Sequence, residues 1–262
     1  MSYETLLYAV ESGVATITFN RPEAANAMSP LVAKEFNDVS LVVEADPNIR
    51  AVVITGAGKM FCAGGDLASF AAAGEGARAL ILQMTGDLHL GISRLTRNPA
   101  PVIGAVNGTA AGAGFSMVMM CDLAISAESA VYTMAYTAAG LSPDGSSTFF
   151  MPRKIGDRRT RELMLTNRVL KAQEAEEWGV VNRVVPDDQL MDEVMALAQT
   201  LANGPTAAFG EVKALLNGSF EQSLETQMEL EARAIAKMIG SEDGQEGVAA
   251  FLNKRKPDFK GL

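Results

Sequence analysis

The chain has 262 residues, of which 48% are hydrophobic and 20% charged, a balance typical of a globular protein with a substantial core. Its net charge of −9 argues against nucleic acid as the main partner, because surfaces that bind nucleic acid are usually basic. The apolar runs are short and interrupted by polar residues or glycine, which argues against a membrane span.

The two cysteines, Cys62 and Cys121, match no metal-binding or redox spacing. We therefore expect two reduced thiols in a cytoplasmic protein, with no metal ion and no redox cofactor. The start, Met1-Ser2-Tyr3-Glu4, lacks the basic stretch and apolar core of a signal peptide, so no export signal is expected.

The first half of the chain alternates strand-like and helix-like segments. Two β-prone runs separated by Glu11-Ser12-Gly13 indicate a hairpin over residues 6–10 and 14–19. The pattern of apolar residues then predicts helices over residues 30–45, 77–97 and 113–120, and strands over residues 51–55, 102–106 and 123–126. This alternation indicates an α/β fold with crossover connections, although the pattern alone also suits an ordinary doubly wound sheet.

Beyond about residue 187 the pattern changes to helices alone. We expect a core that carries the site over residues 1–187 and a C-terminal helical lobe over residues 188–262. No linker between them is long enough to separate independent domains. The helices predicted in the lobe span residues 189–202, 206–216, 224–239 and 244–254.

Two glycine-rich turns are the strongest functional signal in the sequence. Phe61-Cys62-Ala63-Gly64-Gly65-Asp66-Leu67 and Asn107-Gly108-Thr109-Ala110-Ala111-Gly112-Ala113-Gly114 each lie between a β-like run and a helix-like one. Glycine at such a turn lets backbone N–H groups approach a ligand, and two converging turns could present two donors to one oxygen, as in an oxyanion hole. The glycines do not have the spacing of a phosphate loop, a dinucleotide fingerprint or an esterase elbow.

A series of motifs in order resembles the enoyl-CoA hydratase/isomerase (crotonase) superfamily over nearly the whole chain. The resemblance implies the crotonase (ClpP-like) spiral of ββα units, followed by a C-terminal helical lobe. It also implies a homotrimer or a dimer of trimers in which residues 188–262 mediate oligomerisation. Besides the two glycine turns, the motifs are Thr18-Phe19-Asn20-Arg21-Pro22, Asn26-Ala27-Met28, Ala51–Gly56, Met120-Cys121-Asp122, Gly140–Gly145, Glu177–Val181, Glu246–Phe251 and Lys254-Arg255.

The resemblance also implies an acyl-CoA thioester as substrate, with coenzyme A as part of the substrate and no further cofactor. In the family, the thioester oxygen lies between two backbone N–H groups, which by motif position belong to Gly65 and Ala113. One such donor is typically worth about 3–4 kcal/mol to an enolate-like transition state. The other substrate-binding positions implied by motif position or by the basic tail are Ala63, Gly64, Asp66, Leu67, Lys254 and Lys260, although the tail equally suits a solvated terminal helix.

The two glutamates that hydratases of the family use to orient and protonate water are missing. Their positions, four residues after Gly112 and four residues before Gly140, are occupied by Ser116 and Tyr136. A serine and a tyrosine are poor general bases near neutral pH, so we expect these residues to contact the substrate and not to hydrate it.

Asp144 is the carboxylate that remains near the predicted site. On spacing alone, Ser142-Pro143-Asp144-Gly145 is a turn signal and Asp144 a turn residue. The run around it, however, is similar to that of the 1,2-epoxyphenylacetyl-CoA isomerase type of the family, which implies a catalytic aspartate. His89 lies where a 4-chlorobenzoyl-CoA dehalogenase also has a histidine, and we interpret it as a substrate-binding residue, with a catalytic role left open.

These observations favour an isomerase that shifts a double bond of an enoyl-CoA through an enolate, with Asp144 as acid and base. The alternatives are an enoyl-CoA hydratase of fatty-acid metabolism, and a dehalogenase or thioester hydrolase with Asp144 as nucleophile. A non-catalytic relative that binds acyl-CoA or RNA is a further alternative, against which the acidic charge and the presence of Asp144 argue.

Overall fold

The computed structural model describes residues 3–262. Residues 1–2, part of the start from which no export signal is expected, lie outside the described residues. Within residues 3–262, no helix is long and apolar enough to cross a membrane.

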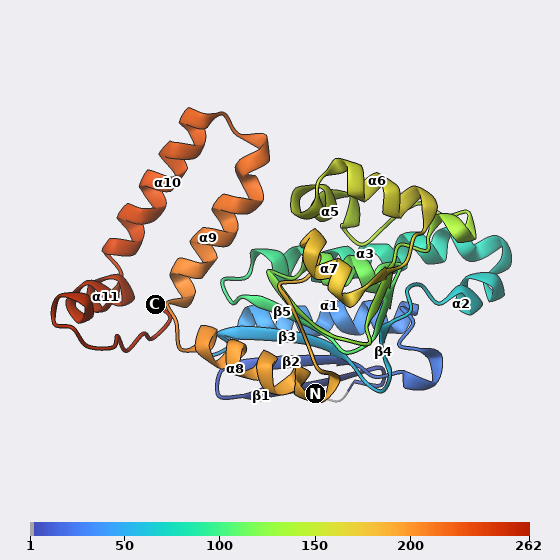
Figure 1. Ribbon diagram of the computed structural model, residues 1–262, viewed down its shortest axis with the longest axis horizontal. Helices are drawn as coiled ribbons and strands as arrows, with labels where there is room; N and C mark the ends of the chain where they lie inside the picture. Colours follow the sequence, from blue (N-terminus) through green and yellow to red (C-terminus); the bar gives the residue numbers. More distant parts are fainter. Residues whose placement is uncertain (1–2) are drawn as a thin grey trace.

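Two β-sheets form the centre of the molecule (Figure 1). In the larger sheet, β1 and β2 pair antiparallel and every other neighbouring pair is parallel, whereas in the smaller sheet only β8 and β9 pair antiparallel. In spatial order, the larger sheet is β1 (Leu6–Glu11), β2 (Val14–Phe19), β3 (Ala51–Gly56), β5 (Val102–Val106), β7 (Leu123–Ala127) and β10 (Arg183–Val185), and the smaller is β4 (Met60–Cys62), β6 (Thr109–Ala111), β8 (Val131–Thr133) and β9 (Leu170–Lys171).

Three successive ββα units build this arrangement. In each unit the first strand joins the larger sheet, the second joins the smaller sheet, and helices follow. The units are β3-β4 with α2 (Leu67–Ala72) and α3 (Ala77–Arg97), β5-β6 with α4 (Ala113–Met120), and β7-β8 with α5 (Ser147–Ile155). The spiral of ββα units predicted from the resemblance is confirmed, and the doubly wound alternative is wrong.

Alternate residues of the central strands supply two hydrophobic clusters. Val52 and Ile54 of β3 join the cluster that contains α1 (Pro30–Ala45) and α3, whereas Ala51 and Val53 join the cluster on the other side. This alternation is the period of two that a strand requires when both faces of its sheet are covered.

The second cluster is closed by α8 (Leu190–Ala202), whose Leu190, Val194, Ala198 and Ala202 pack on the sheet. This helix therefore belongs to the core, although the predicted boundary after residue 187 assigned it to the lobe. In the structure the lobe begins at the turn over residues 203–205. The reason is that the apolar face of α8 is buried against the sheet.

The lobe consists of α9 (Thr206–Gly218), α10 (Leu224–Ile239) and α11 (Glu242–Leu252), which project from the end of the molecule opposite α2 (Figure 1). Ser223 and Ser241 cap α10 and α11 by accepting hydrogen bonds from the backbone N–H groups of Thr226 and Gly244. Because of this cap, α11 begins two residues before the predicted position; it ends at Leu252, before the predicted end at Lys254.

The predicted helices over residues 30–45, 77–97, 113–120 and 224–239 have the observed bounds. The short strands of the smaller sheet were not predicted individually. The remaining elements are α6 (Asp157–Thr166), α7 (Ala172–Trp178) and the 3₁₀ turns η1 (Pro22–Ala24), η2 (Gly74–Gly76), η3 (Thr137–Ala139), η4 (Asp187–Gln189) and η5 (Ser219–Glu221).

Candidate active site

The two glycine-rich turns lie against each other, as the sequence predicts. Gly64 has φ +101° and Gly112 has φ +49°, which are conformations that side chains with a Cβ rarely adopt. A Cβ on Gly64 would lie 3.0 Å from the carbonyl oxygen of Ala111 and 3.4 Å from the Cα of Gly112. Both the backbone conformation and this close approach therefore require glycine where the turns meet.

Two backbone N–H groups of these turns are left without an internal acceptor. The Met28 N–H donates to Gly64 O at 2.7 Å, and the Asp66 N–H donates to Met28 O at 2.9 Å. These two bonds hold the peptide groups on both sides of Gly65, so that the Gly65 N–H points away from Met28. Ala113 is the first residue of α4, where N–H groups have no intrahelical partner. Within residues 3–262 neither N–H donates a hydrogen bond to the protein.

Gly65 and Ala113 line the same cavity, which has a volume of about 510 Å³. The predicted residues Ala63, Gly64, Leu67, Tyr136 and Asp144 also line it. Most of the remaining wall is apolar, and Asp144 and Arg78 are the charged residues of the lining. The side chains of the apolar wall are those of Leu67, Phe70, Ile81, Leu82, Met84, Leu88 and Leu141.

Asp144 is paired with the chain's single histidine. His89 Nε2, on α3, lies 2.7 Å from Asp144 Oδ1, while the side chains are 51% and 30% exposed. The Oδ2 atom of Asp144 makes no hydrogen bond within residues 3–262. His89 thus reaches the site through Asp144 and is not itself part of the cavity lining.

Ser116 and Tyr136 meet beside the backbone of Asp144. The Ser116 Oγ lies 2.7 Å from Asp144 O, and the Tyr136 hydroxyl lies 3.1 Å from Ser116 Oγ. This arrangement could not be predicted from the sequence, because the contacting residues are 20 and 28 positions apart and no local pattern joins them.

Asp66 does not line the cavity and instead organises the chain behind it. Its side chain accepts from the Ser69 N–H at the start of α2 and pairs with Arg21 at 3.1 Å. Burial opposes ionisation, but the hydrogen bonds from Ser69 and Arg21 outweigh it and hold the pKa of Asp66 below its usual value. The geometry therefore favours a capping role over the predicted substrate contact.

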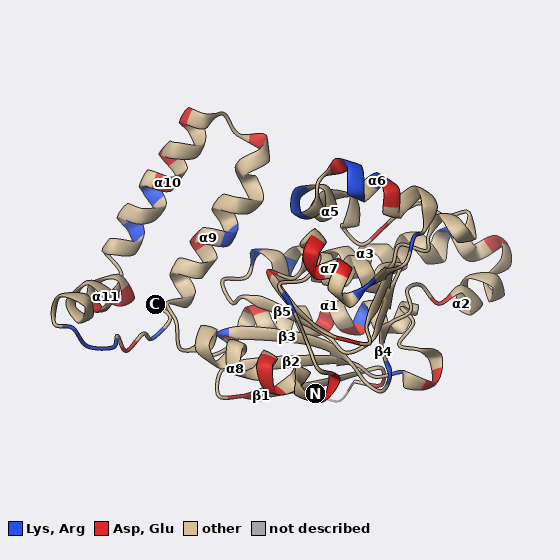
Figure 2. Ribbon diagram, in the orientation of Figure 1, with Lys and Arg blue, Asp and Glu red and all other residues tan. Residues whose placement is uncertain are grey.

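The tail after α11, which contains Lys254 and Lys260, lies at the end of the molecule opposite α2 (Figure 2), and neither lysine lines the cavity. The tail is folded onto the lobe: Arg255 pairs with Glu246 of α11, and the backbone N–H of Lys260 donates to Asp243 of α11 at 2.6 Å. Any contact with the ligand of this cavity would therefore have to come from another copy of the chain.

Residues 3–262 contain no group of three or more His, Cys, Asp or Glu side chains that could hold a metal ion. The metal-independent reaction stays a prediction.

Cys62 and Cys121 are free and buried, and burial raises their pKa to about 11 and about 12. Both thiols are therefore protonated at neutral pH, and neither is a nucleophile.

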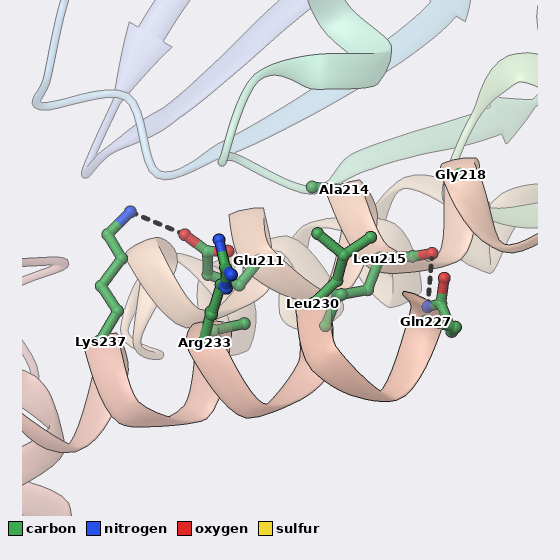
Figure 3. A pocket seen from close by; sticks show the side chains of 9 residues that line it. Glu211, Ala214, Leu215, Gly218, Gln227, Leu230, Arg233 and Lys237 are labelled. Carbon is green, nitrogen blue, oxygen red and sulfur yellow. Dashed lines mark hydrogen bonds and ion pairs between the residues drawn. The ribbon is translucent and has the colours of Figure 1, made fainter. Parts of the chain in front are cut away.

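A smaller hollow of about 250 Å³ lies between α9 and α10 (Figure 3). Its walls combine Leu215 and Leu230 with an ion pair between Lys237 and Glu211 at 2.7 Å. It contains neither of the unpaired N–H groups nor Asp144, so it is not a candidate for the chemistry predicted from the glycine turns.

Known proteins resemble this chain over its whole length. The Enoyl-CoA hydratase/isomerase family matches residues 9–262. A 1,2-epoxyphenylacetyl-CoA isomerase from Escherichia coli (strain K12) is 40% identical over 260 residues, covering 98% of this chain and 99% of the relative. A 4-chlorobenzoyl coenzyme A dehalogenase-2 from Arthrobacter sp is 37% identical over 244 residues, covering 92% and 88%.

Solved structures of the same family have the same fold. The crystal structure of an enoyl-CoA hydratase from Polaromonas sp. JS666 superposes with a TM-score of 0.93 at 33% identity, covering 97% of this chain and 99% of the other. Its description and those of the two relatives name three different reactions, so they do not settle the activity of this chain. They do establish its family: with the ββα spiral and the two converging glycine turns, this chain belongs to the enoyl-CoA hydratase/isomerase family.

Proposed function

We propose that this protein is an enoyl-CoA isomerase that moves a double bond from the 3,4 to the 2,3 position of an acyl-CoA thioester. The observation that carries the proposal is that a single carboxylate, Asp144, lines the same cavity as the unpaired N–H groups of Gly65 and Ala113. These groups are the parts that an enolate mechanism needs: one base and two donors.

The reaction requires one proton to change carbons. The carboxylate of Asp144 takes a proton from C2, and the electron pair of the broken C–H bond is shared by C2, C4 and the thioester oxygen of a dienolate. The N–H groups of Gly65 and Ala113 stabilise the oxygen as its negative charge develops. Asp144 then returns the proton to C4 as the new double bond forms between C2 and C3, so nothing is gained or lost overall.

His89 supports this assignment by occupying one carboxylate oxygen. With Oδ1 held by His89 Nε2 at 2.7 Å, Oδ2 is left to exchange the proton with the substrate. Hydration, in contrast, needs one group to hold water and another to protonate the product. With Ser116 and Tyr136 turned toward the Asp144 backbone, the lining offers no second carboxylate for that task.

The contact between His89 and Asp144 also supports a second candidate, hydrolytic dehalogenation of an aryl-CoA. Asp144 would displace chloride from the ring to give an aryl ester, and water activated by His89 would cleave that ester. We favour the isomerase because it needs only groups that line the cavity, namely Asp144 and the N–H groups of Gly65 and Ala113, whereas dehalogenation also needs His89, which is not part of the lining.

Turnover of three thioesters by the purified protein tests this proposal: a 3-enoyl-CoA, a 2-enoyl-CoA and 4-chlorobenzoyl-CoA. We expect rapid conversion of the 3-enoyl to the 2-enoyl thioester, with little hydration and no chloride release. Efficient hydration of the 2-enoyl thioester without isomerisation would contradict the proposal, and chloride release would favour the second candidate.

A further inference from the structure

Ser116 is a fully buried hydroxyl whose best partner is the backbone of the proposed base. It lies on α4 with 0% of its surface exposed, and its Oγ is 2.7 Å from Asp144 O, against 3.3 Å from Gly112 O on its own helix. The shorter contact identifies Asp144 O as the main acceptor of the Ser116 proton. Loss of this bond would leave the carbonyl oxygen of Asp144 with one partner fewer.

Tyr136 completes the arrangement from the other side. Its hydroxyl is 3.1 Å from Ser116 Oγ and 3.3 Å from Asp144 O, while its ring lines the cavity. Burial raises the pKa of Tyr136 well above its usual value, so the hydroxyl remains a donor at any working pH. Each hydroxyl has one proton, and the distances favour donation from Tyr136 to Ser116 and from Ser116 to Asp144.

The backbone around Asp144 fits closely onto this pair. Gly145 has φ +63°, and a Cβ built on it would lie 2.9 Å from the Cβ of Ser116. Ser147 Oγ donates a further hydrogen bond to Asp144 O at 3.0 Å. The peptide group that follows Asp144 is therefore held from two sides. This peptide group and the Asp144 side chain are attached to the same Cα atom.

The other anchor of Asp144 is much weaker. His89 touches the carboxylate itself, but its side chain is 51% exposed and stands on the surface of α3. An exposed contact of this kind contributes little to holding a loop in place. The hydroxyl groups at the Asp144 backbone, of which that of Ser116 is fully buried, are thus the firmer support.

We infer that Ser116 and Tyr136 are positioning residues, which hold the backbone of Asp144 so that its carboxylate meets both His89 and the substrate. The inference rests on the proposed function for the role of Asp144 in catalysis, but the placement of the carboxylate can be measured without catalysis. A misplacement of about 1 Å of a catalytic group can cost about 100-fold in rate.

The chain contains a matched control pair. Tyr132 donates to Ser126 Oγ at 2.6 Å, and Ser126 donates to Ala127 O at 2.9 Å; both side chains are fully buried, and neither lines the cavity. Tyr132→Phe and Ser126→Ala therefore remove the same kind of buried hydroxyl bond without touching Asp144.

The experiment compares Ser116→Ala and Tyr136→Phe with Tyr132→Phe, Ser126→Ala and Asp144→Asn. Isomerisation kinetics give one readout, and the ring ¹H and ¹⁵N chemical shifts of His89, the chain's single histidine, give the other. We expect Ser116→Ala and Tyr136→Phe to lower kcat about 10- to 100-fold with KM changed less than about 3-fold. Their His89 shifts should move toward those of Asp144→Asn, while both control variants keep wild-type kcat and shifts.

Two results would overturn the inference: wild-type kcat in both variants, or a loss of kcat with wild-type His89 shifts. Should Ser116→Ala not fold, Tyr136→Phe alone decides, because it removes only one hydroxyl and keeps the ring. Should Asp144→Asn prove fully active, the proposed function fails, but the His89 shifts still report whether Ser116 and Tyr136 position Asp144.

Discussion

The core and the C-terminal lobe differ in what they do with their apolar side chains. In the core, Phe36, Phe61 and Phe115 are fully buried. In the lobe formed by α9, α10 and α11, Phe251 is 83% exposed and Ile235 71%, and among residues 206–262 the buried apolar residues are two alanines. The core thus buries its large aromatic side chains within one chain, whereas the lobe leaves an apolar surface exposed, as surfaces that bind a partner do.

The buried polar groups follow the same division. In the core, the buried polar group at the site, the Ser116 hydroxyl, contacts the backbone of Asp144. In the lobe, buried polar groups join α9 to the core and the tail to α11. Lys213 of α9 is 7% exposed and pairs with Asp122 at 2.7 Å, and Asp243 of α11 is 3% exposed and accepts hydrogen bonds from the tail. We therefore propose that chemistry and assembly are assigned to different parts of the chain, and the following predictions test that separation.

Asp144→Asn should have the largest effect, and on the core alone. We expect turnover of a 3-enoyl-CoA to fall about 10²- to 10⁴-fold, the usual range for a general acid–base group, because the amide cannot accept the proton. Thermal unfolding should change little, since the backbone contacts of Asp144 remain. Near-normal turnover would reduce Asp144 to a turn residue.

Lys213→Met should detach the lobe from the core without reaching the site. Removing one partner of a buried ion pair typically costs about 3–5 kcal/mol, and the partial exposure of Asp122 places our expectation near the lower end. Urea unfolding gives the value. The matched control is Lys237→Met. Lys237 pairs with Glu211 at the same distance, 2.7 Å, but its side chain is 69% exposed, so its loss should lower the free energy of unfolding by less than about 1 kcal/mol.

Assembly should depend on the lobe. Sedimentation of the wild type should give three or six chains per particle, and Ile235→Asp combined with Phe251→Asp should give smaller species, because charges would be buried in the contact. The core keeps its own cluster in that variant, so circular dichroism should be unchanged. A wild type that sediments as a monomer would remove the need for a partner surface.

The tail should have the smallest effect. Lys254→Gln with Lys260→Gln should raise KM for CoA thioesters about 2- to 5-fold at low salt and less at high salt, if the tail meets the phosphates of a ligand on another copy. Substitution is preferable to deletion, because the backbone N–H groups of Lys260 and Gly261 satisfy the buried Asp243. Lys34→Gln, an exposed lysine of the core, is the control, and an unchanged KM would leave the tail purely structural.

The long elements and the glycine turns could be predicted from the sequence because their signals are local. Helices α1, α3 and α10 have apolar spacing over four turns or more, and β3 and β5 are continuous buried runs. The strands β4, β6 and β8 have three residues each, and pairing between distant segments, not their own pattern, defines them.

The detail of the site could not be read in the same way. Ser116 and Tyr136 were expected at the substrate, but tertiary contacts turn their hydroxyls toward Asp144. Replacing both residues with glutamate should therefore not restore a hydratase site. Ser116 has no exposed surface and the loop at Gly145 lies against it, so Ser116→Glu should displace Asp144 before it assembles a hydratase site.

The central claim is that one carboxylate both removes and returns the proton, and the stereochemistry of isomerisation tests it most directly. A 3-enoyl-CoA with deuterium at one of the two C2 positions, converted in water and in D₂O, shows which face of C2 loses its hydrogen and which face of C4 gains one. A single base at Asp144 predicts loss and gain on the same face. Delivery to the opposite face of C4 would require a second acid in the cavity and would contradict the account.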